Sequence, residues 1–325
     1  MPRPPLPKPQ VLVVGAGFHR MVQGETMSGP LVSWRCLLEQ VAKSESLPCD
    51  AYLYDSLPLL WEALVTAAVR KRRRHAAYTE ERRLRTRVVA ILKAEAEGCC
   101  HAYDRNNWLR DFARALTVRP THIIDLNFDS LLLKALGCSS RARSPAKGWI
   151  RPRNLRVKDA RNMTRRWDQP GGNITLWKPH GWVGDPSSIR LGTRDYGFQP
   201  AAYSLGFQRF KEAERRSSAR LDKAFGPCRS PPRRDGRADT WITRFMAFET
   251  SMIGVGMTSD EWALRWLCVQ RDRNGARHAV RPIRCHLYSQ FPAIPGVAAV
   301  SHGTWERAWQ AAVDGRTDTA NVTPL

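Results

Sequence analysis

The chain of 325 residues is 42% hydrophobic and contains 12 tryptophans, so it is long enough to bury a substantial core and too apolar to be a disordered protein. No apolar stretch approaches the roughly 20 residues that cross a bilayer, and the first ten residues, MPRPPLPKPQ, lack the apolar segment of a secretory signal. We therefore expect a disordered tail over residues 1–10 and a cytoplasmic protein with no membrane partner. The eight cysteines include no C-x-x-C pair, which is typical of reduced thiols and not of a disulfide framework or a zinc ribbon.

The net charge of +22 indicates an anionic partner such as a nucleic acid, a nucleotide or a membrane surface. Only ten of the 52 basic residues are lysines, however, and an arginine-heavy composition also follows from a GC-rich genome. Nucleic-acid contact through a basic surface and a merely solvated basic surface are therefore equal alternatives at this point.

In the first part of the chain, a short apolar run typical of a strand is followed by segments with the periodicity of helices. Val11–Val14 is a β-branched run that predicts a buried strand, and the Gly15-Ala16-Gly17 run after it predicts a tight turn. Apolar residues recur at helical spacing over residues 30–43, which predicts an amphipathic helix. Three more helices are expected within residues 57–117: at 59–70, at 80–97 with Thr79 as N-cap and Gly98 as stop, and at 107–116.

Two further strands are predicted, and each ends in polar residues. Thr121–Leu126 predicts a buried strand that ends in Asn127-Phe128-Asp129 and continues into a helix over 130–136. Residues 139–172 are rich in arginine, glycine and proline without clear periodicity, which is typical of an insertion. Ile174–Lys178 predicts the next strand, which delivers His180 and Gly181 at its end.

The last third of the chain repeats the alternation. Helices are expected at 204–225, 240–248, 261–270 and 304–313, and strands at 251–255, 282–288 and 297–300. The first of these strands runs into Gly254-Val255-Gly256, and Ser259 or Asp260 is expected to cap the helix that follows.

This alternation predicts an α/β fold with a Rossmann-like, doubly wound parallel sheet and helical insertions. We expect a single domain over residues 11–325, with a helical insertion at about 57–117 and loop or helical insertions at about 139–172 and 197–250. In such a sheet the carboxyl ends of the strands line a crevice in which ligands bind. The expected site therefore lies where four strand ends meet.

Each of these strand ends also has an explanation without a ligand. The Gly15-Ala16-Gly17 turn would let backbone N–H groups approach a phosphate, but G-x-G after a strand is a weak signal alone. Asn127 and Asp129 are suited to sugar hydroxyls if Phe128 turns into the core, whereas Asp129 is equally an ordinary helix cap. His180 is either a general base or a turn histidine beside a Gly181 with positive φ.

Taken in this order, the strand ends resemble the sirtuin fold, and within it the sirtuin-like NAD-hydrolysing domains of bacterial antiphage defence systems. The G-A-G, N-x-D and H-G turns follow the family order, and the resemblance spans residues 11–270. Lys178-Pro179-His180-Gly181, Asp185–Ile189 and Thr193–Tyr196 are similar to the K-x-H-G, D-P-x-x-I and T-x-x-D-Y pattern of that branch. Gly254-Val255-Gly256-Met257 with Asp260 is similar to its G-[YF]-[SG]-L-x-D pattern.

Two features depart from the protein-deacylating sirtuins. Those enzymes carry a four-cysteine zinc module after the catalytic histidine, whereas only Cys228 lies between His180 and Gly254 in this chain. The G-I-P-D-F-R phrase that follows G-A-G in deacylases is replaced here by Phe18-His19-Arg20-Met21. The resemblance therefore implies a sirtuin-like domain with no zinc module and no metal, and it argues against deacylation.

The resemblance implies an NAD⁺ hydrolase that cleaves the nicotinamide–ribose bond, releases nicotinamide and ADP-ribose, and depletes NAD as an antiphage effector when triggered. The implied catalytic residues are His180 as general base and Asn127, which positions water or the ribose. The implied NAD-binding residues are Gly15, Ala16 and Gly17 at the pyrophosphate, Asp129 at the ribose hydroxyls or its own turn, and Gly254, Gly256 and Thr258 at the adenosine side. The implied partners are further copies of the chain or a defence protein that triggers activity. Arg194 and Asp195 could support the histidine loop from behind or form a surface ion pair, and we favour the surface pair.

Two other functions remain open at this point. The same pocket is suited to a non-catalytic sensor of NAD or ADP-ribose, and the charge of +22 also fits a nucleic-acid-associated subunit of a defence complex. An assay of NAD consumption tests the first alternative, and the salt dependence of nucleic-acid binding tests the second.

Overall fold

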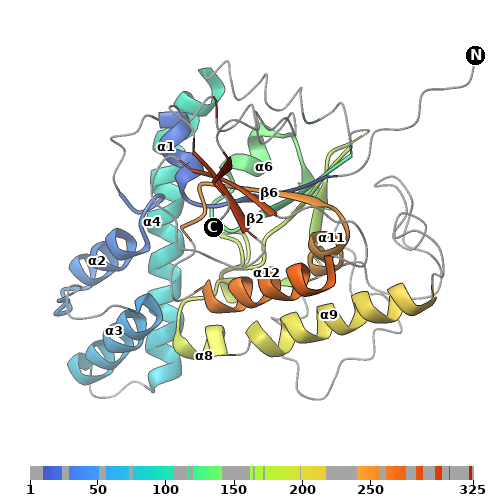
Figure 1. The fold of residues 1–325 in the computed structure, drawn as a ribbon. Helices are drawn as coiled ribbons and strands as arrows, with labels where there is room; N and C mark the ends of the chain where they lie inside the picture. The colour runs from blue at the N-terminus through green and yellow to red at the C-terminus, as the bar shows by residue number, and fades with distance from the viewer. Residues whose placement is uncertain are drawn as a thin grey trace, which may run out of the picture.

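One sheet forms the centre of the structure, a computed structural model of the chain (Figure 1). The structure describes residues 10–23, 29–50, 56–72, 76–105, 116, 120–140, 162–163, 165–170, 173–197, 199–216, 240–256, 261–275, 283–287, 297–301, 307 and 322–323. Within these residues nine strands pair in the order β3-β4-β5-β2-β1-β6-β7-β8-β9.

Six adjacent strands of this sheet run parallel to one another. They are β1 (Gln10–Val14), β2 (Thr121–Asp125), β5 (Ile174–Trp177), β6 (Glu249–Ile253), β7 (Ile283–Leu287) and β8 (Val297–Ser301). The short strands β3 (Ser139–Ser140), β4 (Arg166–Asp168) and β9 (Val322–Thr323) pair antiparallel at the two edges. Numbered along the chain, the six parallel strands lie in the order 3-2-1-4-5-6, which is the order of a doubly wound dinucleotide-binding sheet. The expectation of an α/β fold with a parallel sheet is therefore confirmed, and the strand order is compatible with a Rossmann-like fold.

Helices cover both faces of the sheet (Figure 1). Their bounds are α1 Gly17–Gln23, α2 Trp34–Ser44, α3 Leu57–Arg72, α4 Ala77–Arg105, α6 Leu131–Ala135, α8 Thr193–Gly197, α9 Gln199–Arg216, α11 Trp241–Ala247 and α12 Trp262–Gly275. None of the helices in the described part of the chain is long and apolar enough to cross a membrane.

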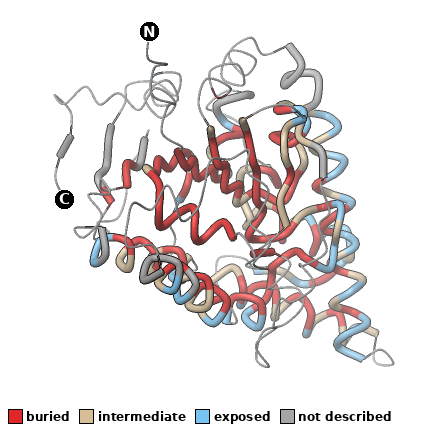
Figure 2. Tube along the Cα trace, turned by 90° about the vertical axis from the view of Figure 1, so that its right-hand side faces the viewer, coloured by how far each residue is buried: buried red, intermediate tan, exposed pale blue. Residues whose placement is uncertain are grey.

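The sheet separates two hydrophobic cores because strand side chains alternate between its faces. Leu12 and Val14 of β1 belong to the core shared with α2, α3, α4 and α6. Val11 and Val13 belong to the second core, which is shared with α9, α11 and α12. All five residues of β1 are buried, as expected for a parallel strand covered on both faces. Figure 2 shows this burial along the strands, with exposed residues along the outer sides of the helices.

Helix α4 passes the residue that was expected to stop it. The helix continues from Ala77 through Gly98 to Arg105, and Gly98 is absent from the described glycines with positive φ. An interior glycine costs a helix only about 1 kcal/mol relative to alanine, and the buried side chains of Leu84, Val88 and Leu92 attach α4 to the core. Helix α9 also differs, since it begins at Gln199 instead of 204. The predictions for residues 1–9, for most of 107–116 and for most of 304–313 lie outside the described residues.

The register of the central strands brings their carboxyl ends level. Val14 lies opposite both Asp125 of β2 and Ile253 of β6, and Trp177 of β5 lies opposite Ile124. The turns that leave β1, β2, β5 and β6 therefore emerge at one edge of the sheet. This edge includes the point between β1 and β6 where the strand order reverses, which is where ligands bind in such sheets.

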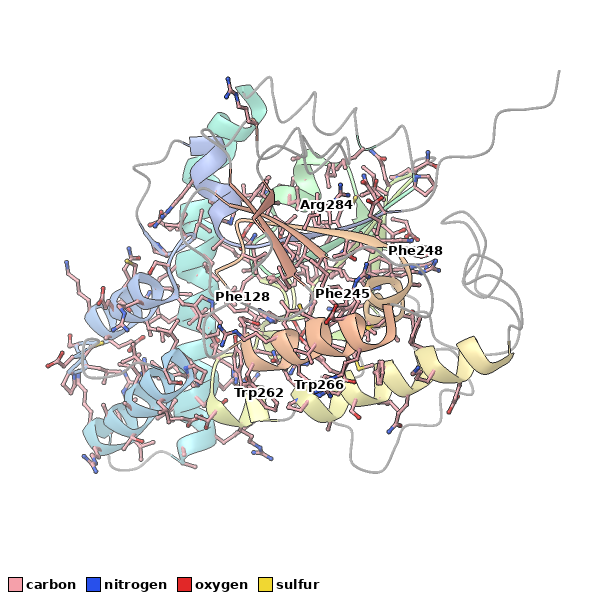
Figure 3. All side chains as sticks on the ribbon, in the orientation of Figure 1. Phe128, Phe245, Phe248, Trp262, Trp266 and Arg284 are labelled. Carbon is pink, nitrogen blue, oxygen red and sulfur yellow. The ribbon has the colours of Figure 1, made fainter. Side chains whose placement is uncertain are left out.

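A buried histidine in β2 links the stability of this sheet to pH. The ring of His122 stacks on that of Phe248, which Figure 3 labels, at a centroid distance of 5.6 Å. Burial, together with the charges of Arg244 and Arg166, lowers the pKa of His122 well below its usual range. The folded protein thus holds this imidazole neutral.

We expect the substitution His122→Phe to remove part of the acid sensitivity of the fold. The unfolded chain protonates His122 below about pH 6.5, so the wild-type free energy of unfolding falls as the pH drops through that value. One proton contributes at most about 1.4 kcal/mol per pH unit. Phenylalanine keeps a ring in the stack and takes up no proton, so its variant should lose less stability between about pH 8 and pH 5. Urea unfolding across that range measures the difference, and parallel pH profiles would contradict the prediction.

Candidate functional site

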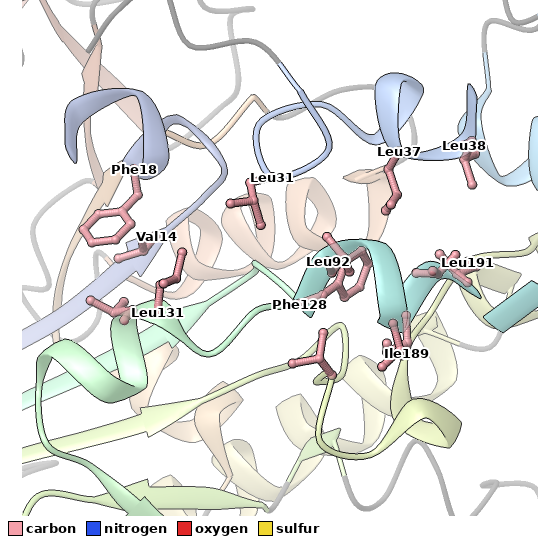
Figure 4. Packing of buried hydrophobic residues seen from close by; sticks show 14 of the residues in the cluster. Val14, Phe18, Leu31, Leu37, Leu38, Leu92, Phe128, Leu131, Ile189 and Leu191 are labelled. Atoms are coloured by element: carbon pink, nitrogen blue, oxygen red, sulfur yellow. The ribbon is translucent and has the colours of Figure 1, made fainter. Parts of the chain in front are cut away.

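The turns after β1, β2, β5 and β6 line one cavity of about 230 Å³. The predicted site residues on its surface are Gly15, Ala16, Asn127, Asp129, His180 and Gly256. The opposite wall is apolar. It comes from Leu31, in the turn before α2, and from Trp34, Leu57 and Leu92 of the helices that follow β1. Figure 4 shows Leu31, Leu92 and Phe128 among the buried side chains that pack here. The structure therefore brings together residues that lie more than 200 positions apart in the sequence.

Three of the predicted glycines pack against each other. The N–H of Gly15 donates to the carbonyl of Ile253, and the N–H of Gly17 donates to the carbonyl of Gly254. A Cβ atom on Gly15 would lie 2.3 Å from the Gly254 oxygen, and one on Gly17 would lie 2.6 Å from the Gly254 Cα. Gly254 itself has a φ of 62°.

Because of this packing, only some of the predicted glycine-turn residues can contact a ligand. Gly17 and Gly254 are absent from the cavity lining, because each is turned toward the other. The amides of Gly15 and Gly17 are already engaged within the fold, which leaves the Ala16 amide as the candidate donor of this turn. Gly256 does line the cavity, whereas Thr258 lies outside the described residues.

The Asn127-Phe128-Asp129 turn is held from several sides. The Asn127 backbone N–H donates to Asp125 Oδ1 at 3.0 Å, and its side-chain Nδ2 donates to the Gly15 carbonyl at 3.2 Å. Phe128 is buried and stacks on Trp34 with 5.2 Å between ring centroids. Asn127 and Asp129 line the cavity, and so does Phe128, which belongs to the first hydrophobic core as well.

Asp129 has two partners. Its Oδ1 accepts the N–H of Leu131, the first residue of α6, at 2.8 Å, although the N-cap position itself is Ser130. Its Oδ2 lies 3.1 Å from Nε2 of His19, a buried residue of α1. Burial opposes ionisation of this carboxyl, but the charge and hydrogen bond of His19 outweigh it and hold the pKa of Asp129 below its usual range. Sequence reasoning missed this role of His19, because no local spacing indicates that the third residue of α1 faces the turn after β2.

A buried ion pair joins the ends of β2 and β5. Lys178 Nζ lies 2.6 Å from Asp125 Oδ2 and also donates to the carbonyl of Asn127 at 2.8 Å. Both side chains of the pair are 1% exposed. The lysine of the K-P-H-G run is therefore a support for the turn that carries Asn127.

The His180 turn is fixed by its own loop. The N–H of Arg190 donates to the His180 carbonyl at 2.8 Å, and the Arg190 guanidinium donates to the carbonyl of Pro179 at 3.1 Å. Gly181 has a φ of 100°, and a Cβ atom there would lie 2.3 Å from the Ser188 oxygen. The positive φ of Gly181 is the conformation that the turn-histidine alternative supposed. The side chain of His180 is 4% exposed and borders the cavity, unlike that of a solvent-facing turn histidine.

The prediction of a surface ion pair at Arg194 and Asp195 is wrong for Asp195. Arg194 is exposed, but Asp195 is buried, and its Oδ2 accepts hydrogen bonds from the Leu191 N–H and from Arg85 of α4. The partner lies 110 positions earlier in the chain, which local sequence reasoning cannot detect.

Glu261 is a cavity residue that the sequence indicated only as the start of a helix. It lies directly before α12, and its Oε2 is 3.4 Å from Nε2 of His180. Glu261 also lines the cavity, so a second titratable group stands beside the predicted base.

No protein-family model and no curated protein matches this sequence. Within the described residues no three His, Cys, Asp or Glu side chains come together as a metal site. The polar side chains that line the cavity include Asn127, Asp129, His180 and Glu261. His180 and Glu261 form a histidine–carboxylate pair, and His19 pairs with Asp129 from outside the lining.

We expect the substitution Lys178→Met to destabilise the protein strongly. It leaves Asp125 without its buried counter-ion, and loss of one partner of a buried pair costs about 3–5 kcal/mol. The double variant Asp125→Asn with Lys178→Met removes the stranded charge and keeps an acceptor for the Asn127 N–H, so it should recover part of that loss. Urea unfolding of both variants measures the effect. A loss below about 1 kcal/mol in the single variant, the value of a surface pair, would contradict the prediction.

Proposed function

We propose that this protein is an NAD⁺ hydrolase that cleaves the nicotinamide–ribose bond to give nicotinamide and ADP-ribose. The observation that carries the proposal is the convergence of Gly15-Ala16, Asn127, Asp129 and His180 on one cavity at the reversal point of a Rossmann-like sheet. The resemblance of the same residues, in the same order, to sirtuin-like NAD-hydrolysing domains adds the reaction type.

The cavity suits the reacting half of a dinucleotide. Its volume of about 230 Å³ is below the roughly 300–1,000 Å³ of cavities that enclose drug-sized ligands. We therefore expect it to hold only nicotinamide and ribose, and the pyrophosphate would leave it past Ala16. The adenosine would then extend along the turn after β6, beside Gly256.

Two side chains carry the proposed chemistry. Bond cleavage sends the electron pair of the C1′–N bond to nicotinamide, which leaves as a neutral ring, and positive charge develops on the ribose. Water then forms the new bond to C1′, and His180 accepts its proton as general base. Asn127 donates through Nδ2 to Gly15, so its Oδ1, which accepts no hydrogen bond from the described residues, is available to hold the water or a ribose hydroxyl.

Asp129 supports this arrangement electrostatically. The carboxylate is held ionised beside His19, and it lies at the edge of the cavity where the ribose would bind. A negative charge fixed near the ribose before the reaction stabilises an oxocarbenium-like transition state without reorganisation. In the proposed role the protein depletes NAD as a defence effector, triggered by self-association or by a partner protein.

We expect the substitution His180→Ala to lower the turnover of NAD⁺ by about 10²–10⁴-fold, which is the usual contribution of a general base. Release of nicotinamide and ADP-ribose, separated by chromatography, provides the measurement. His122→Phe is the matched control, because His122 is an equally buried histidine of the same sheet that does not line the cavity.

Hydrolysis by His180→Ala at the wild-type rate would contradict this role of the histidine. Wild-type protein that binds NAD⁺ without releasing nicotinamide, with or without a candidate trigger, would replace the proposal with the sensor function.

A further inference from the structure

Glu261 and His180 approach each other from different parts of the fold. His180 follows β5, and Glu261 precedes α12, which follows the turn after β6. Glu261 Oε2 lies 3.4 Å from His180 Nε2, and the side chains are 17% and 4% exposed. Both residues border the cavity with Asn127.

These two atoms have no alternative partner in the described part of the chain. Both are buried, and neither makes a hydrogen bond to a described residue. Lys178, two residues before the histidine, is occupied by Asp125 and by the Asn127 carbonyl. The ring of Tyr196 of α8 lies 6.1 Å from the imidazole. Because both atoms are removed from water and lack other partners, only an interaction with each other can offset the cost of burying them.

The position of Glu261 is set by the packing of α12, independently of the histidine. Ala263, Leu264 and Leu267 of this helix are fully buried in the second core. Figure 3 shows Trp262 and Trp266 along the same helix. A neutral imidazole can adopt two ring orientations and two tautomers. A carboxylate that a packed helix holds in place favours the orientation and tautomer that donate a hydrogen bond to it.

We propose that Glu261 is a positioning residue for His180. Its carboxylate accepts the Nε2 proton of the imidazole, which keeps the Nε2–H tautomer and leaves Nδ1 as the unprotonated nitrogen that faces the proton to be removed. The gap of 3.4 Å is slightly long for this hydrogen bond, and such contacts commonly shorten when substrate is bound. The catalytic part of this inference rests on the proposed function, whereas the tautomer is a property of the protein alone.

The test therefore has one readout without NAD⁺ and one with it. Long-range ¹H–¹⁵N spectra of the ¹⁵N-histidine-labelled full chain report the protonated ring nitrogen, and the His180→Ala spectrum assigns the His180 signals. Steady-state kinetics then give kcat and KM for NAD⁺. The variants are Glu261→Ala, which removes the acceptor, and Glu261→Gln, which keeps an acceptor of the same size.

Glu249→Gln is the matched control. Glu249 begins β6 at the opposite end of the strand from the cavity and pairs with Arg284 at 2.7 Å. It tests whether the loss of any partly buried carboxylate near β6 has the same effect. Thermal unfolding of each variant identifies one that does not fold. If Glu261→Ala is such a variant, the wild-type spectrum keeps the test available, because it shows by itself which nitrogen of His180 carries the proton.

The expected spectrum of the wild type shows the Nε2–H tautomer of His180, retained in Glu261→Gln and Glu249→Gln and lost to a mixture in Glu261→Ala. We expect kcat to fall about 10–100-fold in Glu261→Ala, as for other residues that orient a functional histidine, with KM changed less than kcat and with partial rescue in Glu261→Gln. A wild-type proton on Nδ1, or an unchanged His180 spectrum in Glu261→Ala, would overturn the proposal. If the wild type releases no nicotinamide, the proposed function fails, and the spectra still decide whether Glu261 positions the imidazole.

Discussion

The buried ion pair between Lys178 and Asp125 holds the polar edge of the cavity in place. It joins the ends of two neighbouring parallel strands, and the same lysine fixes the carbonyl of Asn127. Removing two charges from water is costly, so such a pair stabilises a protein only when its geometry is good and its remaining hydrogen-bonding capacity is used. Here the second carboxylate oxygen of Asp125 accepts a hydrogen bond from the Asn127 N–H. Asn127 is thus held at two backbone points before any ligand is bound, and Asp129 and His180 are placed relative to it.

The glycine turns show how a motif can be explained by the fold itself. Gly15, Gly17 and Gly254 are required because the turns after β1 and β6 touch at backbone distance. This contact closes the reversal point of the sheet and aligns Ala16 and Gly256 on the cavity surface. The glycines at 15, 17 and 254 therefore reflect a closely packed reversal point, and recognition of a dinucleotide would depend on the side chains around it.

Much of this arrangement was predictable, because parallel strands end at one edge of a sheet whatever their distance in sequence. The apolar runs indicated β1, β2 and β5, and the polar residues after them then had to converge. The contacts of Glu261, His19 and Asp195 were not predictable, since each depends on how a helix is oriented against a distant turn. The prediction that a helix ends at Gly98 was wrong for another reason. The burial of Leu92 and its neighbours outweighs the weak preference of a glycine to end a helix.

The helices inserted after β1 give the cavity its asymmetry. A parallel sheet supplies polar strand ends along one edge but no wall opposite them, and α2, α3 and α4 supply that wall with Trp34, Leu57 and Leu92. An apolar wall excludes bulk water, which strengthens every charge interaction at the polar edge. Under the proposed function, the exclusion of bulk water has two consequences. The fixed carboxylate of Asp129 acts more strongly on a developing cation. The attacking water is confined to the side of the cavity where Asn127 and His180 can hold it. The same asymmetry makes the pairing of His180 with Glu261 important, because an imidazole shielded from bulk solvent depends on its protein neighbours to decide which nitrogen carries the proton.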